Sequence, residues 1–319
     1  MLCIHLKKND PFFCLATEEY LLKNFKEDIF MLWQSEDTVV IGKHQNAMAE
    51  VNYPYVIAND IKVARRISGG GTVFHDAGNL NFAYIKNVDS PSQISFSRFV
   101  QPIVEALGEL GVHATVSGRN DLLLDNKKIS GNAEHIFKNR VLHHGTLLYN
   151  SNLETLGLSI KVAPGKYEGK AVQSKRSVVT NILPYLKDNI SLREFTSYML
   201  KYESEKPGST LYDLSGDDLN IIQQLVKEKF MTWDWNFGYS PKYTFKNEDQ
   251  IEDKHFKVEL QVERGHINNA DISGTYFTSQ QASDLNELLI GERHTYNDIL
   301  QNVRNINPDI QENLINLFF

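Results

Sequence analysis

The sequence predicts an α+β protein with a large domain at residues 1–243 and a small C-terminal αβ accessory domain at residues 250–319. Segments rich in β-forming residues come in runs that few helical patterns interrupt, which favours a large mixed or antiparallel sheet. A polar stretch at 246–254, LysAsnGluAspGlnIleGluAspLys, reads as a linker after an apolar segment. The length of 319 residues suits one large and one small domain.

The helices expected in the large domain follow from hydrophobic periodicity and capping signals. Gly111 stands where the C-terminal cap of a helix belongs, directly after apolar residues at helical spacing. Ser191 with Glu194 forms a capping-box pattern that opens another helix. The expected helices are 15–24, 96–110, one after Ser191, and 215–230.

The strands expected in the large domain crowd around a glycine-rich segment. The pair AspAsn at 125–126 lies between two β-forming segments and predicts a hairpin. His135 is expected on a helix or loop. The expected strands are 30–33, 38–41, 61–66, 72–74, 80–85, 121–124, 128–130 and 141–149.

The C-terminal part begins with strict alternation of apolar and polar residues. Phe256, Val258, Leu260 and Val262 alternate with polar side chains, which predicts a half-buried strand. The remaining expected elements are a turn at Gly265, a returning strand over 267–272, helices over 279–290 and 295–303, and a last helix capped by Asn307 with Pro308 in its first turn.

Composition excludes several classes of protein. A net charge of −7 argues against a general binder of nucleic acid or of anionic membranes. No apolar run approaches the ~20 residues of a membrane span, and the N-terminus lacks an apolar core of signal-peptide length. Only Cys3 and Cys14 are present, too few and too close for a secreted disulfide framework. We therefore expect a cytoplasmic protein, and we expect it to be a monomer.

The most informative motif is ArgArgIleSerGlyGlyGlyThrValPheHisAsp at 65–76. Three consecutive glycines weaken a strand, but they allow positive φ or close approach of the backbone to a ligand. Amides of such a turn can form an anion-binding concavity, with Arg65 and Arg66 at its edge. A Walker loop and a dinucleotide fingerprint are excluded, because a strand follows Gly71 and Phe74 stands where the fingerprint needs glycine. The motif predicts a site for a phosphate, a carboxylate or both.

Two further segments join this motif. GlyArgAsnAspLeuLeuLeuAspAsnLysLysIleSerGlyAsnAla runs over 118–133, and HisHisGlyThrLeuLeu over 143–148. In this order and spacing the three segments resemble the lipoate–protein ligases of the biotin/lipoate ligase superfamily. The resemblance extends to the motifs at 15–19, 42–46 and 175–181, and covers most of residues 1 to about 240. It implies a catalytic domain of the biotin/lipoate ligase type.

The resemblance implies an adenylating enzyme that uses ATP, Mg²⁺ and lipoate. Its products would be lipoyl-AMP and then a lipoylated lysine on an acceptor, either the lipoyl domain of a 2-oxoacid dehydrogenase E2 or a glycine-cleavage H protein. Lys128 and Arg66 carry over as catalytic residues, and alternation along the strand points Lys127 to the opposite face. Asp121 carries over as the metal contact, in keeping with the preference of Mg²⁺ for oxygen ligands. The implied nucleotide-binding residues are Arg66, Gly71, Thr72, Val73, Phe74, Asn120, Asp121 and Lys128.

The implied lipoate-binding residues are Ser68, Gly69, Gly70, Gly71, His75, Asn79, Lys128 and His144. Phe74 fits the hydrophobic core equally well, since an aromatic residue in a strand is usually buried. One of the pair His143 and His144 is expected to face away from the pocket, and their spacing makes zinc unlikely. Arg65 is expected to pair with an acidic neighbour or with solvent.

Residues 161–176 are expected to form a lid over the adenylate. The segment contains five basic residues against one acid, together with Pro164, Gly165 and Gly169. A solvated surface loop explains the same composition. The resemblance implies Lys170, Lys175 and Arg176 as the lid residues.

Four alternatives remain beside the ligase. An amidotransferase of this fold would need a nucleophilic cysteine near the lysine, and Cys3 and Cys14 match no such motif. A transferase that uses a preformed acyl-AMP or another acyl donor would keep every motif. A biotin ligase fits the glycine loop less well. A module that binds lipoate or nucleotide without turnover is the non-enzyme alternative, against which the intact Arg66, Lys128, Asn120 and Asp121 argue.

Overall fold

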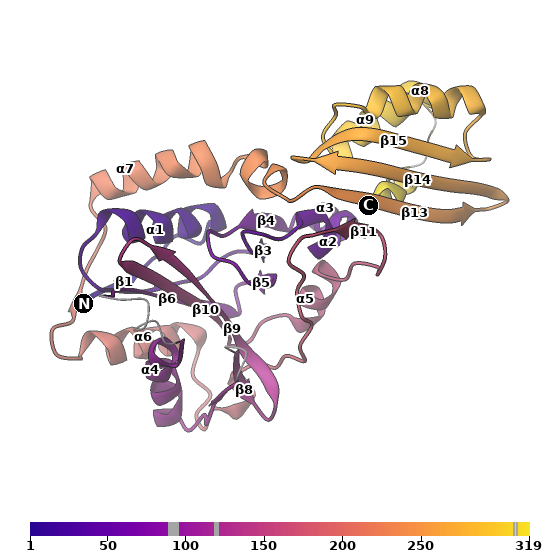
Figure 1. Cartoon of the computed structure of the whole chain (residues 1–319). Helices are drawn as coiled ribbons and strands as arrows, with labels where there is room; N and C mark the ends of the chain where they lie inside the picture. The colour runs from indigo at the N-terminus through magenta and orange to yellow at the C-terminus, as the bar shows by residue number, and fades with distance from the viewer. Residues whose placement is uncertain (89–95, 118–120, 309, 311) are drawn as a thin grey trace. The chain divides into compact units, whose positions relative to one another are not determined.

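The computed structural model describes residues 1–88, 96–117, 121–308, 310 and 312–319 (Figure 1). The chain packs into two compact units, each assembled from segments that are distant in sequence. The expected domain ranges stay a prediction, because compact packing does not show which segment folds on its own. The large unit comprises Met1–Lys43, Lys62–Leu156 and Ser174–Met231; the small unit comprises His44–Ile61, Gly157–Gln173 and Thr232–Phe319.

The large unit is built on an eight-stranded mixed sheet, so the predicted α+β class is confirmed. The strand order is β12-β1-β2-β6-β10-β9-β8-β7. Strands β12, β1 and β2 run parallel, and every later pair is antiparallel. The bounds are β1 (Leu2–His5), β2 (Ile29–Trp33), β6 (Asn79–Asn87), β7 (Thr115–Val116), β8 (Asp121–Leu124), β9 (Lys127–Phe137), β10 (Arg140–Leu148) and β12 (Thr210–Leu211).

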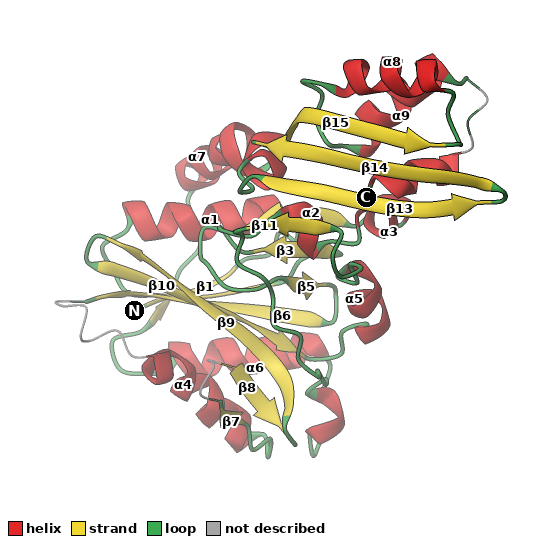
Figure 2. Cartoon of the chain, turned by 45° about the vertical axis from the view of Figure 1, so that its right-hand side comes forward, coloured by secondary structure: helices red, strands yellow, loops and turns green. Residues whose placement is uncertain are grey.

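Helices cover both faces of this sheet (Figures 1 and 2). Helix α1 (Pro11–Asn24) packs on β6 and β10, with α7 (Gly216–Leu225) beside it. Helices α4 (Phe96–Glu109) and α6 (Leu192–Ser204) lie on the opposite face, where Phe99 and Phe195 join the main hydrophobic core. Because both faces are covered, the central strands β2 and β10 are buried along their whole length.

A second sheet of the large unit holds the glycine motif. Strand β3 (Thr38–Ile41) lies between β4 (Lys62–Arg65), which is parallel to it, and β5 (Val73–His75), which is antiparallel. The residues between β4 and β5, here called the glycine loop (66–72), therefore join the two strands that flank β3.

The small unit contains a four-stranded antiparallel sheet in the order β11-β13-β14-β15. Buried residues alternate along β14 as the sequence predicts, and Gly265 turns the chain at φ +74°. The other elements along the chain include α5 (Leu153–Ser159), η2 (Leu183–Tyr185), η3 (Val226–Phe230) and η4 (Asp234–Gly238). The small unit includes α2 (Ala47–Glu50), α3 (Tyr53–Ala58), β11 (Tyr167–Gly169), β13 (Tyr243–Ile251), β14 (Lys254–Glu263), β15 (His266–Gly274), α8 (Ser279–Leu289), α9 (Tyr296–Ile306) and η5 (Glu312–Phe318).

Three predictions of local structure are wrong. The polar stretch 246–254 is not a linker, because most of it belongs to β13, whose charged residues lie opposite charged residues of β14, as Glu248 does Lys257. His135 lies in β9 rather than on a helix or loop. The last helix is a 3-10 helix at Glu312–Phe318 and does not begin at Asn307.

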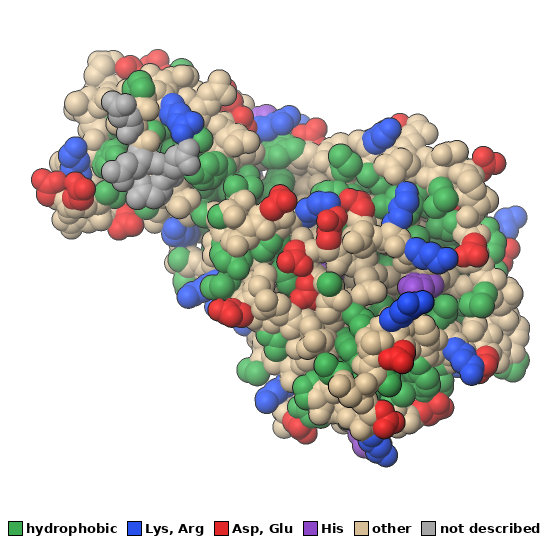
Figure 3. All heavy atoms as spheres, turned by 180° about the vertical axis from the view of Figure 1, so that it is seen from behind, with side chains coloured by type: hydrophobic (Ala, Val, Ile, Leu, Met, Phe, Trp, Pro, Cys, Tyr) green, Lys and Arg blue, Asp and Glu red, His purple; other side chains and the backbone are tan. Residues whose placement is uncertain are grey.

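Acidic and basic side chains are interspersed on the face of the molecule shown in Figure 3. Within the described parts of the chain, none of the helices combines the length and the apolar character needed to cross a membrane.

Candidate active site

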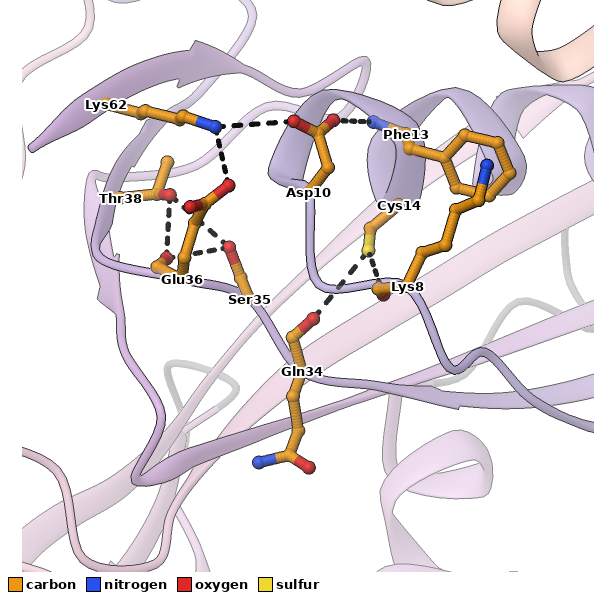
Figure 4. Close-up of polar contacts among 9 residues, drawn as sticks. All are labelled: Lys8, Asp10, Phe13, Cys14, Gln34, Ser35, Glu36, Thr38 and Lys62. Atoms are coloured by element: carbon orange, nitrogen blue, oxygen red, sulfur yellow. Dashed lines mark hydrogen bonds and ion pairs between the residues drawn. The ribbon is translucent and has the colours of Figure 1, made fainter.

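The N-terminus of α1 is fastened to the glycine-motif sheet by charged side chains (Figure 4). Asp10 caps the helix by accepting a 2.7 Å hydrogen bond from the amide of Phe13. Lys62, the first residue of β4, lies 3.3 Å from the Asp10 carboxylate and 2.5 Å from that of Glu36. This cluster links the start of α1 to β4, the strand that leads into the glycine loop.

The two cysteines are buried and unsuited to nucleophilic chemistry. Cys14 donates from Sγ to the carbonyl oxygens of Lys8 (3.3 Å) and Gln34 (3.7 Å), as Figure 4 shows. Burial, assisted by nearby carboxylates, raises the pKa of Cys14 well above its usual value. Burial also raises the pKa of Cys3 to about 11. A thioester mechanism needs a thiolate, which these environments disfavour.

The glycine loop is held by backbone hydrogen bonds at the end of β3. The amide of Arg66 donates to the Ile41 carbonyl at 3.1 Å, and the amide of Lys43 donates to the Ser68 carbonyl at 2.8 Å. Gly70 has φ +87°, and a Cβ there would lie 3.1 Å from Nη2 of Arg66. The loop therefore needs glycine at position 70 for its backbone conformation.

Arg66 is a buried cation, only 5% exposed. Its Nη2 donates to the carbonyl oxygens of Gly69 (2.7 Å) and Gly71 (2.6 Å), and its Nε donates to Oγ of Ser68 at 3.0 Å. Burial lowers the pKa of Arg66 to about 10, and the Glu18 carboxylate opposes this fall. The guanidinium therefore stays charged at neutral pH.

The Arg65 side chain donates to backbone carbonyls of the segment that follows β3. Its side chain is fully buried, and Nη1 donates to the carbonyl oxygens of Gly42 (3.1 Å) and Lys43 (3.0 Å). Arg65 is the buried last residue of β4. Its hydrogen bonds therefore connect the end of β4 to the segment that follows β3.

A chain of buried polar groups leads away from Arg66. Oγ of Ser68 lies 2.6 Å from Nε2 of His144, and Nδ1 of His144 lies 2.7 Å from Oε2 of Glu18. The indole N–H of Trp33 donates to the other oxygen of Glu18 at 3.1 Å. The exposed fractions of Ser68, His144 and Glu18 are 0%, 8% and 1%. His143, one residue earlier on β10, stacks on Phe99 of α4 at 5.0 Å, on the opposite face of the sheet.

Lys128 lies at an irregularity of β9. The pairing with β8 shifts between Leu122, which lies opposite Ser130, and Leu123, which lies opposite Lys128. The ammonium of Lys128 lies 2.9 Å from the Asp121 carboxylate, with both side chains about one-fifth exposed (22% and 18%). Lys127 is exposed. A β-bulge changes the direction of the side chains beside it, here that of Lys128.

A second segment fastens the backbone of Lys128. Its amide donates to the Val178 carbonyl at 2.8 Å, and its carbonyl accepts from the amide of Thr180 at 3.0 Å. A few residues earlier, Oγ of Ser174 accepts from the amide of Thr72 at 2.8 Å. The segment 174–180 thus touches both the glycine loop and Lys128.

Close contacts bring β9 against the glycine loop. A Cβ placed on Gly131 would lie 2.9 Å from Nζ of Lys128 and 3.7 Å from Cγ1 of Val73. A Cβ placed on Gly70 would lie 3.6 Å from Cβ of Ala133. The glycine loop, the Lys128 ammonium and β9 therefore form one contiguous group, in which Gly131 leaves room for the ammonium.

Several expected ligand contacts are buried. Phe74 is 1% exposed and lies in the core. His75 packs edge-on against Trp33 at 5.3 Å, and burial lowers its pKa to about 3. Asn79 is fully buried and donates to Oδ1 of Asn81 at 2.9 Å. Among the described residues no partner is found for Nδ1 of His75 or Oδ1 of Asn79.

The expected lid and metal residues are less constrained. Lys170, Lys175 and Arg176 are exposed, and β11 pairs part of the lid segment with β13 in the small unit. Asn120 lies outside the described residues. The described part of the chain contains no group of three or more His, Cys, Asp or Glu side chains placed to hold a metal ion.

Sequence reasoning missed Glu18, Trp33 and Ser174. A signal was present for Glu18, because it lies in the motif at 15–19 to which the family resemblance extends. Nothing in the sequence identifies its partners, which come from other elements.

The chain matches two family patterns in tandem. The pattern described as the lipoyl protein ligase A/B catalytic domain matches residues 10–203, and the one described as the bacterial lipoate protein ligase C-terminus matches residues 240–317. The chain belongs to the lipoate–protein ligase family. It is therefore an enzyme of the ligase class.

Named relatives span almost the whole chain. Lipoate–protein ligase 1 of Staphylococcus aureus is 41% identical, over 91% of this chain and 89% of its own. The lipoate–protein ligase LplJ of Bacillus subtilis is 38% identical, over 92% of each.

Solved structures of lipoate–protein ligases share the fold of most of this chain. The structure of a lipoate–protein ligase A bound with ATP has a TM-score of 0.63 at 25% identity, over 75% of this chain and all of that one. A Thermoplasma acidophilum protein with bound lipoic acid has a TM-score of 0.64 at 25% identity, covering 74% and 100%. A bipartite archaeal ligase studied with its E2 lipoyl domain has a TM-score of 0.64 at 25% identity, covering 75% and 96%.

Proposed function

We propose that this chain activates lipoate with ATP and transfers the lipoyl group to a lysine of a lipoyl-domain acceptor. The lipoate carboxylate attacks the α-phosphate of ATP, which forms lipoyl-AMP and releases pyrophosphate. The ε-amine of the acceptor lysine then attacks the acyl carbon, which forms the amide and releases AMP. The observation that carries this proposal is the Lys128 ammonium held beside the glycine loop and the Asp121 carboxylate.

Lys128 would stabilise charge on the phosphate and acyl oxygens in both steps. Its backbone is bonded to residues 178–180, which fixes where the side chain leaves β9. Preorganised donors of this kind are worth roughly 3–4 kcal/mol each in a transition state. Arg66 would contribute positive charge and hold the loop carbonyls so that loop amides face the ligand.

Mg²⁺ would bind together with the nucleotide and would have few ligands from the protein. No group of three or more His, Cys, Asp or Glu side chains among the described residues is placed to hold a metal, which fits an ion held mainly by phosphates and water. Asp121 is the candidate protein ligand, because its carboxylate already lies beside Lys128. Mg²⁺ would neutralise phosphate charge there.

The acceptor would be an E2 lipoyl domain or a glycine-cleavage H protein. Support for a lipoyl domain comes from the archaeal ligase that was studied with its E2 lipoyl domain. We further propose a cytoplasmic monomer; light scattering of the purified chain tests the monomer.

The decisive experiment incubates the protein with ATP, Mg²⁺, lipoate and a lipoyl domain, and measures the mass of the acceptor. The proposal expects a lipoyl adduct that requires ATP. A parallel measurement of ATP–pyrophosphate exchange distinguishes a transferase that uses only preformed lipoyl-AMP, since that enzyme would modify the domain from lipoyl-AMP but show no exchange.

A further inference from the structure

With His144 neutral, the chain of polar groups behind Arg66 has one consistent arrangement of hydrogen atoms. A Glu18 carboxylate only accepts hydrogen bonds, so the indole of Trp33 and Nδ1 of His144 both donate to it. The neutral imidazole then presents Nε2 as an acceptor, and the Ser68 hydroxyl donates to it. Oγ of Ser68 keeps a lone pair for the Nε–H of Arg66. Every donor in the chain therefore points towards Glu18.

This arrangement resembles a nucleophilic Ser–His–Glu triad, but it is unsuited to that role. Ser68 is fully buried, whereas a nucleophile must reach the substrate. Its oxygen also accepts a charge-assisted hydrogen bond from Arg66, which withdraws electron density from the atom that would attack.

Glu18 and Arg66 are two buried charges of opposite sign that do not touch. A buried cation requires a counter-charge. Within the described part of the chain the Arg66 guanidinium donates only to uncharged groups, which are Ser68 and the carbonyls of Val40, Gly69 and Gly71. Aligned hydrogen bonds polarise one another, so the carboxylate acts on the guanidinium through Ser68 and His144.

We propose that Glu18, His144 and Ser68 form a positioning relay that orients the Arg66 guanidinium and supplies its counter-charge. The relay rests on the proposed function, because the reaction gives Arg66 its task. Glu18 acts through Arg66 and is a positioning residue. Glu19, the next residue of α1, bonds instead to Lys23 (2.6 Å) and Lys229 (2.5 Å) and lies outside the relay.

The kinetic test replaces Glu18 with glutamine, which keeps the shape but has a single acceptor oxygen and cannot accept from both Trp33 and His144. In Glu18→Gln we expect kcat for lipoyl-AMP formation to fall about 10- to 100-fold, as when an orienting partner of a reactive side chain is lost. The KM for ATP should change less than kcat. The matched control is Glu19→Gln, a carboxylate of similar burial (3% against 1%), which should keep kcat.

A double-mutant cycle tests whether Glu18 acts through Arg66. If it does, Glu18→Gln should have little further effect on kcat in the Arg66→Met background. An equal fold-change in both backgrounds would overturn the relay. An acyl group trapped on Ser68 would overturn it in favour of nucleophilic catalysis.

A spectroscopic test does not depend on enzyme activity. Ring ¹⁵N shifts of His144 in the wild-type protein should report the neutral Nδ1–H tautomer, and Glu18→Gln should alter this tautomer. An Nε2–H tautomer in the wild type would refute the relay. A wild-type protein that forms no lipoyl-AMP would refute the proposed function, and the tautomer would still decide the relay.

Discussion

Replacing Lys128 with alanine separates a catalytic role from a structural one. The ion pair with Asp121 is partly exposed, at 22% and 18%, and such pairs contribute about 0–1 kcal/mol to stability. The backbone bonds of Lys128 to Val178 and Thr180 do not involve the side chain, so the variant keeps them. We therefore expect the free energy of unfolding to fall by no more than about 1 kcal/mol.

The expected effect on activity is larger. Loss of one preorganised contact to the developing charge should lower the rates of adenylation and of transfer at least about 100-fold, which corresponds to ~2.7 kcal/mol in the transition state. A fall of about 1 kcal/mol leaves a protein of ordinary stability folded, so unfolding cannot account for the lost rate.

The assays are urea unfolding, ATP–pyrophosphate exchange, and transfer from synthetic lipoyl-AMP. Lys127→Ala is the matched control, because that lysine is adjacent but exposed and should be nearly silent in all three. Normal pyrophosphate exchange in Lys128→Ala would refute the assigned role. A loss of stability as large as the loss of transition-state binding would show that Lys128 acts on the fold.

Four further outcomes are expected. Replacing Cys3 and Cys14 together by alanine should leave ligation within a few-fold of wild type, and a trapped acyl-thioester at either position would contradict this. Gly70→Ala should lower the free energy of unfolding by about 1–2 kcal/mol because of its φ of +87°, measured by urea titration. His75 has a pKa lowered to about 3, so on acidification the unfolded state takes up this proton before the folded state does. The free energy of unfolding should therefore fall as pH drops from about 6.5 towards 3. His75→Gln should reduce this pH dependence in unfolding curves taken at several pH values. Hydrogen exchange in 161–176 should slow when lipoate and ATP are both present, and equal exchange with and without them would count against a lid.

Features set by neighbouring residues could be predicted from the sequence. Asp125 and Asn126 have φ of 48° and 60°, as the predicted tight hairpin requires, and Ser191 and Glu194 form both bonds of the capping box. Gly111, with φ +80°, lies two residues after the last residue of α4, which it was expected to cap. In each case the residues that decide the conformation lie within a few positions of one another.

Features set by pairing across the fold were mispredicted. Segment 246–254 has the composition of a linker, yet most of it forms a strand, because β14 lies beside it and supplies opposite charges such as Glu259 opposite Lys246. The basic, glycine-containing composition of 161–176 likewise gives no sign that Tyr167–Gly169 pairs with β13. Composition describes the solvent-facing side of a strand but not its hydrogen-bonding partner.

In the candidate site, too, the features set by neighbouring residues could be predicted and those set by distant residues could not. The glycine loop belongs to a continuous motif whose residue types alone indicated anion chemistry, and the role of Lys128 was implied by the resemblance of the continuous motif at 118–133. Glu18 reaches His144 across 126 positions of sequence, and only the packing of α1 against β10 brings them together. Its neighbour Glu19 is equally buried but pairs with lysines, so residue type and burial together do not separate the two carboxylates. Which carboxylate serves Arg66 is decided by the rotation of α1 about its axis, and this rotation is set by the packing of the buried helix on β6 and β10.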